Sequence, residues 1–397
     1  MDGYQQRIDG PQGVSLTTRT AVRLDGMVSE DLFSPERIVA AQRAAAAAGL
    51  DALLLTPSAD LRYLTGYAAT PSERLTCLVV PAEGEATLIV PRLERPAAEA
   101  SPAPGTGVRI VDHPDGGNPY PLVVTAMGGS AETVGLANRM WAEQVLALRE
   151  ALPRARQRLA GDVLRELRMR KSAAEVAALR QAGAAIDAVH ARMGEWLRPG
   201  RTEAEVAADI GAAIRDTHQS TVDFAIVASG PNGASPHHGA GDRVIQAGEP
   251  VVVDIGGTVP SGYWSDSTRT YVVGGPPPAD FLAYYAVLQE AQRAAVAAVR
   301  PGVPAEAVDA TARDLLAAAG YGPYFLHRTG HGIGLDGHEE PYVVAGNARP
   351  LEPGMAFSIE PGVYLAGRHG ARIEDIVVCT SDGVERLNRR PTELVVL

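Results

Sequence analysis

The order of apolar and polar positions divides the chain into two regions. In the first region, short apolar runs alternate with helical stretches, which predicts an α/β layer domain that ends near residue 160. Its first helix is expected to have Ser34 as N-cap, Pro35 at the first helical position and Gly49 as its stop. Apolar strands are predicted at 51–55, 74–81, 86–91, 108–112 and 133–137.

The second region has longer predicted helices than the first. Ser172 and Glu175 form a capping box, which predicts a helix that runs to about Leu197. Thr202 and Glu205 repeat the same signal for the next helix. Residues 221–230 then read as a strand, and helices alternate with β-rich stretches up to the end of the chain.

An internal echo suggests that the second region is duplicated. RPGRTEAEV begins at Arg198, and RPGVPAEAV begins at Arg300. Each is a helix end, a Pro-Gly break and a new helix, followed by a β-rich stretch with two isolated acidic residues. The echo predicts two similar helix–helix–hairpin halves with a site between them.

Composition narrows the class of partner. The chain has 397 residues, 46% hydrophobic and 21% charged, with a formal net charge of −11. This balance is typical of a globular protein, and the negative charge argues against binding to nucleic acid or an anionic membrane. Cys77 and Cys379 lack metal-binding or redox spacing, so we expect reduced thiols and a cytoplasmic location.

Acidic and histidine residues gather where strands or turns are expected. Residues 251–273 read as a hairpin, with Asp254 at the end of one strand and Asp266 at the start of the other. Two carboxylates held this close would repel unless a cation lay between them. Read alone, both could equally be ordinary turn residues.

A Gly-rich loop and two β-like runs add further candidates. The loop carries three histidines, and imidazole is both a common metal ligand and a proton shuttle. Glu360 ends one apolar run, and Glu374 is predicted to lie inside another, where a carboxylate needs a partner. A plain ion pair between Glu374 and Arg372 is the simpler reading. The three histidines are His327, His331 and His338.

Taken together, the segments GYWSDSTRTY, HRTGHGIGLDGHE, IEPGVY and RIED resemble the signatures of the pita-bread metallopeptidases. The likeness covers about residues 160–397, and the first half resembles the creatinase-like N-terminal domain of the prolidase and aminopeptidase P branch. The resemblance implies a loose tail (1–28), a creatinase-like α/β domain (29–160) and an α+β pita-bread catalytic domain with pseudo-twofold halves (161–397). One departure from the family pattern is that the hairpin is one residue longer than is common. We place the extra residue in the turn of the hairpin.

The resemblance also implies roles for individual residues. Asp254 would bind one divalent ion, His331 and Glu360 the other, while Asp266 and Glu374 would bridge both. Glu360 would also accept a proton from the attacking water. His237 rather than His238 would contact the substrate, His338 would bind the scissile carbonyl or oxyanion, and His327 would line the proline pocket. Phe224 would line the same apolar pocket, and Tyr364 and Arg372 would hold Glu360 and the bridging carboxylates.

The function implied is hydrolysis of the Xaa-Pro bond by a bridging hydroxide between two ions. Manganese is favoured, with cobalt, iron or zinc possible, and a homodimer is expected on the same family grounds. The sequence leaves open whether the enzyme is an Xaa-Pro dipeptidase or an Xaa-Pro aminopeptidase. Two alternatives remain at this point: a metal-free, creatinase-like amidinohydrolase, and a binding protein without activity.

Overall fold

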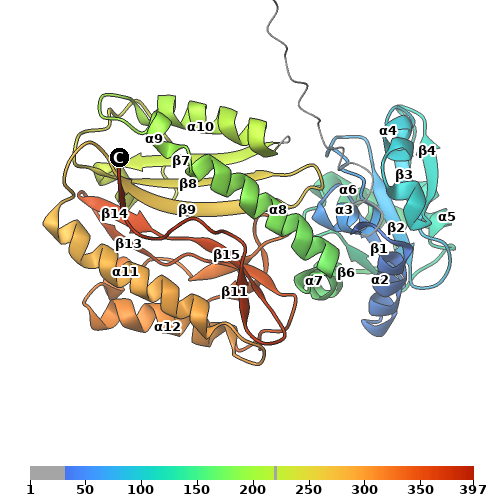
Figure 1. Cartoon of the computed structure of the whole chain (residues 1–397). Helices are drawn as coiled ribbons and strands as arrows, with labels where there is room; N and C mark the ends of the chain where they lie inside the picture. The colour runs from blue at the N-terminus through green and yellow to red at the C-terminus, as the bar shows by residue number, and fades with distance from the viewer. Residues whose placement is uncertain (1–31, 219–220) are drawn as a thin grey trace, which may run out of the picture.

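The computed structural model describes residues 32–218 and 221–397, so the tail predicted for 1–28 lies outside the described residues. Two domains lie side by side in Figure 1, with the N-terminal domain on the right and the larger catalytic domain on the left. Helix α8 (Ala173–His190) begins next to the N-terminal domain and runs across the catalytic domain. Within the described residues, none of the helices combines the length and hydropathy needed to cross a membrane.

The N-terminal domain is built on a mixed sheet with strand order β4-β3-β2-β1-β5-β6. Its strands are β1 (Ala52–Leu55), β2 (Cys77–Pro81), β3 (Thr87–Pro91), β4 (Arg109–His113), β5 (Thr133–Leu136) and β6 (Arg156–Leu159). Strands β1, β5 and β6 run parallel to one another, whereas β2 is antiparallel to β1. Five of these six strands match the runs that the sequence predicts, and β6 was not foreseen because its side chains are mostly exposed.

Helices cover both faces of this sheet. They are α2 (Pro35–Ala47), α3 (Ala59–Thr65), α4 (Arg95–Ala100), α5 (Tyr120–Ala126), α6 (Ala142–Ala151) and α7 (Gly161–Met169). Successive residues of β1 face opposite sides, as the period of a strand requires. Leu53 and Leu55 join the core under α2, while Ala52 and Leu54 join the core under α5 and α6.

The catalytic domain consists of two halves, each a helix pair packed on a sheet. In the first half, α8, α9 (Met193–Trp196) and α10 (Glu203–His218) pack on β7 (Val222–Ser229), β8 (Pro250–Thr258) and β9 (Trp264–Val272). The predicted long helix therefore ends at His190, and a break at 191–192 lets Met193 and Trp196 turn into the core.

The second half repeats this arrangement with α11 (Ala279–Ala298) and α12 (Ala305–Ala318), which lie below the sheets in Figure 1. Its strands form a five-stranded sheet in the order β11-β10-β12-β15-β16 and a β13-β14 pair, and β17 (Val395–Val396) joins the edge of β9. The strands are β10 (Gly330–Gly332), β11 (Glu339–Val343), β12 (Ala356–Ile359), β13 (Gly362–Leu365), β14 (His369–Arg372), β15 (Asp375–Cys379) and β16 (Val384–Arg386).

The two Pro-Gly breaks occupy equivalent places in the two halves. Gly200 and Gly302 have φ angles of +88° and +84°, which favour glycine. The N–H of Gly200 donates to the carbonyl of Ile245 at 2.9 Å, and the N–H of Gly302 donates to the carbonyl of Leu351 at 2.8 Å. These matching contacts support the duplication predicted from the sequence echo.

A shared core joins the two domains. It extends from α2 and the N-terminal sheet to Leu179 of α8 and Tyr263 at the tip of the β8–β9 hairpin. The hydroxyl of Tyr263 donates to Glu175 at 2.7 Å, and Glu175 lies 3.1 Å from the guanidinium of Arg37 on α2. The hairpin that carries Asp254 and Asp266 is therefore anchored to the N-terminal domain.

Candidate active site

The β8–β9 hairpin brings Asp254 and Asp266 to one face of its sheet. In the register, Asp254 lies opposite Thr268, and Asp266 lies opposite Gly256, so the two carboxylates are diagonal neighbours. Asp254 stands in the middle of β8, whereas the sequence had placed it at the strand end. Position 256 requires a glycine for a steric reason, because a Cβ there would lie 2.4 Å from the ring of Phe224 on β7.

The second half supplies an imidazole and two more carboxylates. His331, on β10, places its Nε2 atom 3.7 Å from Asp266 and 3.2 Å from Glu360. Glu360 follows the end of β12, as the sequence predicts. Glu374 lies in the short break between β14 and β15, so the prediction of a continuous strand through it was wrong. Its backbone N–H instead donates to Thr268 of β9 at 3.1 Å.

These groups lie in one cavity of about 540 Å³. All but one of the predicted site residues line it; the exception is Tyr364, which lies behind the wall. The lining includes Phe224, His237, Asp254, Asp266, His327, Arg328, His331, His338, Glu360, Arg372 and Glu374. Side chains that lie more than 100 positions apart in the sequence therefore face the same space.

Crowding perturbs the carboxyl groups strongly. Burial, and next the charge of Asp254, raise the pKa of Asp266 well above its usual value. Burial and Asp266 do the same to the pKa of Glu374, and burial raises the pKa of Glu360 to about 7. Burial and the nearby His338 lower the pKa of His331 to about 3, so this imidazole is neutral at pH 7. Several buried carboxylates beside a neutral imidazole call for a cation.

The donor atoms fit such a cation. Ligand atoms of Asp266, His331 and Glu374 all lie within 4.8 Å of one another. The Oδ1 atom of Asp254 is buried and has no hydrogen-bond partner among the described residues. A buried acceptor without a donor is costly, and a bound ion would remove that cost. Carboxylate oxygens and one imidazole nitrogen suit divalent first-row metals.

Arg372 and Tyr364 hold the site in a different way from the one predicted. Arg372 donates to the Oδ2 atom of Asp254 at 2.6 Å, rather than to Glu374 or Glu360. The hydroxyl of Tyr364 accepts from Arg372 at 2.8 Å and lies 2.8 Å from the Nε2 atom of His327. The plain Arg372–Glu374 ion pair is absent from the described residues, because the guanidinium of Arg372 on β14 pairs with Asp254 on β8 instead.

The partners of the two glutamates are hydroxyl groups that the sequence reasoning missed. Thr268 donates to Glu374 at 2.7 Å, and Ser358 donates to Glu360 at 3.0 Å. Both stand on buried strands, two positions from a carboxylate of the site: Thr268 follows Asp266, and Ser358 precedes Glu360. Ser358 is the polar residue in the apolar run AFSI, which is a signal in the sequence, whereas Thr268 lies in the polar stretch WSDSTRT and has no such signal.

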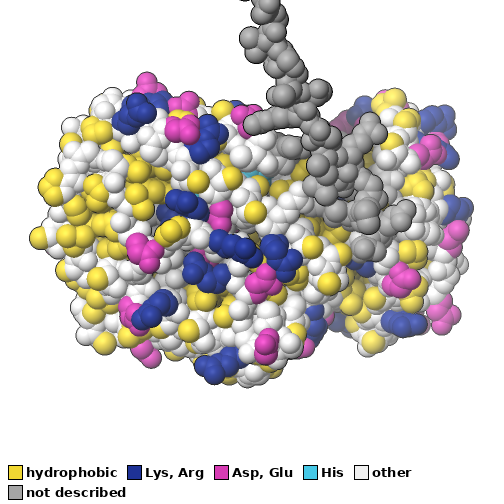
Figure 2. All heavy atoms as spheres, in the orientation of Figure 1, with side chains coloured by type: hydrophobic (Ala, Val, Ile, Leu, Met, Phe, Trp, Pro, Cys, Tyr) yellow, Lys and Arg dark blue, Asp and Glu magenta, His cyan; other side chains and the backbone are white. Residues whose placement is uncertain are grey.

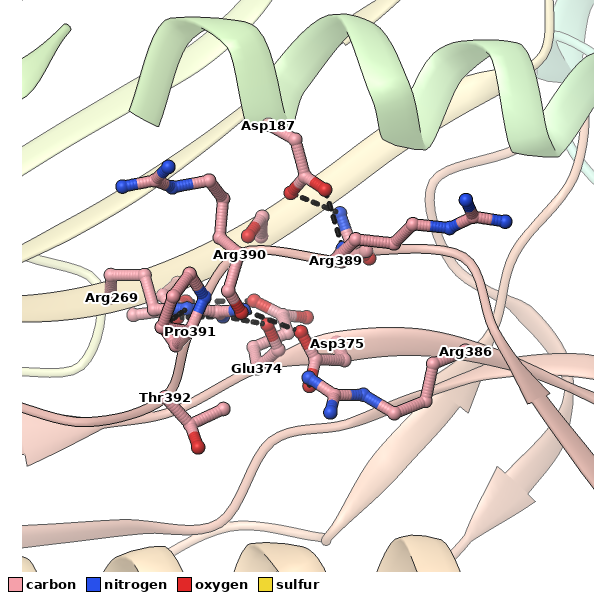
Figure 3. Close-up of polar contacts among 12 residues, drawn as sticks. Asp187, Arg269, Glu374, Asp375, Arg386, Arg389, Arg390, Pro391 and Thr392 are labelled. Carbon is pink, nitrogen blue, oxygen red and sulfur yellow. Dashed lines mark hydrogen bonds and ion pairs between the residues drawn. The ribbon is translucent and has the colours of Figure 1, made fainter. Parts of the chain in front are cut away.

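Behind Glu374 a network of charges fixes its backbone (Figure 3). Arg269 of β9 donates to the carbonyl of Glu374 at 2.6 Å and to the carboxylate of the buried Asp375 at 2.6 Å. Arg269 also reaches the carbonyls of Arg390 and Pro391, so the C-terminal segment closes over this network. Strands β9 and β15, which flank Glu374, are thereby held together.

A separate anchor holds the loop that carries His237. Glu203, at the start of α10, is fully buried, and its carboxylate accepts from the backbone N–H of Ser229 at 2.7 Å. It also lies 2.8 Å from the Nε2 atom of His238. His238 therefore turns toward Glu203, while its neighbour His237 lines the cavity. Of the two histidines, His237 is therefore the one that borders the cavity, and its contact with the substrate stays a prediction.

We expect Glu203→Ala to lower kcat/KM about 10-fold for an Xaa-Pro dipeptide, the substrate that the sequence resemblance implies. The loop would no longer hold His237 in place, and displacements of about 1 Å can cost up to ~10²-fold. Metal content should stay unchanged, since Glu203 lies outside the carboxylate cluster. The matched control is Glu205→Ala in the same helical turn, which removes the acceptor for the backbone N–H of Thr202 and a long ion pair with Arg201 at 3.9 Å. Equal activities of the two variants would contradict the anchoring role of Glu203.

Comparison with known proteins identifies the family. Residues 177–381 match the model of metallopeptidase family M24, and residues 37–170 match the creatinase/prolidase N-terminal domain. The chain belongs to metallopeptidase family M24. The predicted fold, a creatinase-like domain followed by a pita-bread catalytic domain, is confirmed.

Named relatives of this M24 chain are peptidases. It is 55% identical to a probable dipeptidase PepE of Mycobacterium tuberculosis, over 91% of this chain and 96% of the relative. The crystal structure of dipeptidase PepE from Mycobacterium ulcerans superposes with a TM-score of 0.85 and 57% identity, over 91% of this chain and 97% of that one. A prolidase from Thermococcus sibiricus gives a TM-score of 0.85 at 38% identity, over 91% and 98% of the two chains.

Proposed function

We propose that this M24 protein hydrolyses the Xaa-Pro bond of dipeptides and short peptides with two divalent metal ions. One observation carries the proposal: four carboxylates and one neutral imidazole converge in a cavity that three further histidines line. The names of relatives point the same way. One relative is called a prolidase, and another, from Bacillus anthracis, is called an Xaa-Pro dipeptidase and is 32% identical over 92% of this chain.

We infer that the five residues of the cluster hold the ions. Asp254 would bind one ion, and His331 and Glu360 the other, with Asp266 and Glu374 shared between them. Two ions held in this way would neutralise the carboxylates and lower the pKa of the attacking water. We assign Glu360 as the proton acceptor, because it is the most exposed of the four carboxylates: its side chain is 15% exposed, against 12% for Asp254 and 8% for Asp266.

The remaining histidines handle the substrate. His338 lines the cavity and would donate to the scissile carbonyl as negative charge develops on its oxygen. His237 would contact the substrate from the opposite loop. His327 and Phe224 would receive the proline ring, and the bond of His327 to Tyr364 fixes its orientation.

Manganese is our proposed metal, because oxygen-rich sites suit it. Cobalt, iron and zinc remain alternatives. We also propose a cytoplasmic homodimer. Both cysteines are buried and unpaired, which is compatible with a reducing compartment. Basic and acidic side chains are interspersed on the face shown in Figure 2, in keeping with a protein that does not bind nucleic acid.

The test is hydrolysis of Ala-Pro by purified protein that has been stripped of metal and then reloaded with Mn²⁺. We expect no turnover without metal and full turnover after reloading. Turnover of Ala-Pro that survives complete removal of metal would contradict the proposed role of the two ions. A loaded protein that cuts no Xaa-Pro peptide would overturn the peptidase proposal, and the metal-free amidinohydrolase would become the leading alternative, ahead of the binding protein.

A further inference from the structure

Asp309 is a buried carboxylate that does not line the active-site cavity and takes no part in the proposed mechanism. It stands on α12 and is only 1% exposed. Its Oδ1 atom accepts from the hydroxyl of Thr329 at 2.8 Å and from the backbone N–H of Thr329 at 3.1 Å. A buried charge is costly even when it is paired, and apolar residues often replace it without loss of stability. Packing alone therefore does not account for an aspartate at this position.

Arg313, one turn further along α12, completes a clamp with Asp309. Its guanidinium donates to both carboxylate oxygens of Asp309 at 2.9 Å. It also donates to the carbonyl of His327 at 2.9 Å and to the carbonyl of Phe325 at 3.3 Å, and it lies 4.3 Å from the centre of the Phe325 ring. Within the described residues, the side-chain hydrogen bonds of this α12 clamp that leave the helix all go to the segment 325–329.

This segment leads directly into the active site. His327 lines the cavity, and His331 follows two positions after Thr329. The carbonyl of Thr329 accepts from the backbone N–H of Glu360 at 2.8 Å, so Thr329 also fixes the place of Glu360. His331 and Glu360 are the residues to which we assign one of the two ions. The α12 clamp therefore holds the backbone from which the ligands of that ion project.

The first half of the catalytic domain contains a matching contact. Glu203 of α10 accepts from both the backbone N–H and the hydroxyl of Ser229, each at 2.7 Å. In the sequence echo, Ala305 takes the place of Glu203, and Asp309 lies about one helical turn further along α12. In each half, the helix after the Pro-Gly break thus uses a buried carboxylate to hold a Ser or Thr near that half's part of the site.

We propose that Asp309 is a positioning residue for the metal ion that His331 and Glu360 would hold. Its carboxylate, kept in place by Arg313, sets the backbone of the segment 325–329 so that both ligands reach one ion. This inference rests on the proposed metal site. Residues that support metal ligands commonly contribute ~10–100-fold to metal affinity. The effect is therefore expected in the binding of metal rather than in the chemical step.

The experiment measures the binding of Mn²⁺ to the metal-free full chain by calorimetry. Asp309→Ala should weaken the binding of one of the two ions about 10-fold. Asp309→Asn retains an oxygen that accepts from Thr329 but loses the pairing with Arg313, so it should weaken the same ion by a smaller factor. The matched control is Asp314→Ala, because Asp314 is an exposed acid on the same helix. It should leave both affinities unchanged.

Activity and folding separate this role from a merely structural one. In Asp309→Ala, kcat for Ala-Pro should fall at limiting Mn²⁺ and return to near the wild-type value in excess Mn²⁺. The variant should still fold, because the backbone N–H of Thr329 also donates to the carbonyl of Val343 at 3.0 Å, and because the side chain of Arg313 is 32% exposed and can reach water. Circular dichroism of the metal-free chains checks the fold.

Two results would overturn the inference alone: equal Mn²⁺ affinities in the wild type and Asp309→Ala, or a kcat that stays low in excess Mn²⁺. In both cases the proposed function would stand. If the alanine variant failed to fold, wild-type affinity in Asp309→Asn would overturn the inference in its place. A wild-type chain that binds no divalent ion would instead overturn the proposed metal site, and the inference with it.

Discussion

Replacing Glu374 by alanine is expected to remove bound metal and nearly all hydrolysis of Ala-Pro. Glu374 is only 2% exposed, and its donor atom lies within 4.8 Å of those of Asp266 and His331. We assign it as a ligand shared by both ions, so its loss should weaken both positions at once. The measurement is metal content per chain after dialysis, together with kcat/KM for Ala-Pro.

The fold of this variant should survive. Burial and the neighbouring carboxylates raise the pKa of Glu374, which means that its ionised form is unfavourable in the metal-free protein. Removing it relieves this repulsion and leaves Thr268 without its acceptor, a loss of about 1–3 kcal/mol. Circular dichroism of the metal-free variant should therefore match that of the metal-free wild type.

Two further variants sharpen the test. Glu374→Gln keeps the shape and an acceptor for Thr268 but lacks the charge, so it should also lose metal. Glu385→Ala removes a glutamate that pairs with Arg180 at 2.8 Å near the surface, and it should keep both metal and activity. If Glu374→Ala retained both ions and full activity, the proposed ligand set would be wrong.

Much of the fold could be read from the sequence because local signals were strong. Ser172 and Glu175 form the capping box that the sequence predicts. The two Pro-Gly breaks mark equivalent turns of two halves, since each glycine adopts a positive φ that few other residues tolerate. The prediction failed where tertiary contacts decide the outcome: β6 has little apolar pattern, and the helix from Ser172 breaks at 191–192 because Met193 and Trp196 pack inward.

The candidate site, like the fold, was predictable from the sequence only in part. Residue types and motif order were enough to list the groups that the structure gathers in one cavity. Pairing among them was not predictable, because it depends on which strands face one another. Arg372 is two positions from Glu374 in the sequence, yet it donates to Asp254 on β8, a strand of the other half of the domain. Glu203 carried no distinct signal, since a glutamate in the first turn of a helix is usually exposed and supports the helix dipole.

A second cavity, of about 530 Å³ between the two domains, could not be predicted from the sequence for a related reason. Its walls come from loops after β1, β5 and β6 and from the segment around His338. Each loop alone looks like an ordinary connection. Only the strand order β2-β1-β5-β6 places three of these loops at one edge, and only the shared core under α2 brings that edge to the catalytic domain.

The second large effect is expected from replacing His338. The hydrogen bonding of this residue determines which of its two ring nitrogens carries the proton. The Nδ1 atom lies 3.1 Å from a terminal nitrogen of Arg328, and a guanidinium can only donate. Nδ1 therefore accepts, and the proton of the neutral ring stays on Nε2. Burial and the charge of Arg328 lower the pKa of His338, so the neutral form persists at pH 7. The ring is thus a fixed donor.

We expect His338→Ala to lower kcat for Ala-Pro by roughly 10²–10³, the effect of losing one donor to a developing oxyanion. Metal content should be unchanged, because His338 stacks on His331, with ring centroids 3.8 Å apart, but contributes no atom to the carboxylate cluster. His338→Gln retains a side-chain N–H and should recover part of the rate. An unchanged kcat in the alanine variant would assign His338 a purely structural role. A loss of metal would instead show that it supports His331, and the oxyanion assignment would then pass to another donor lining the same cavity.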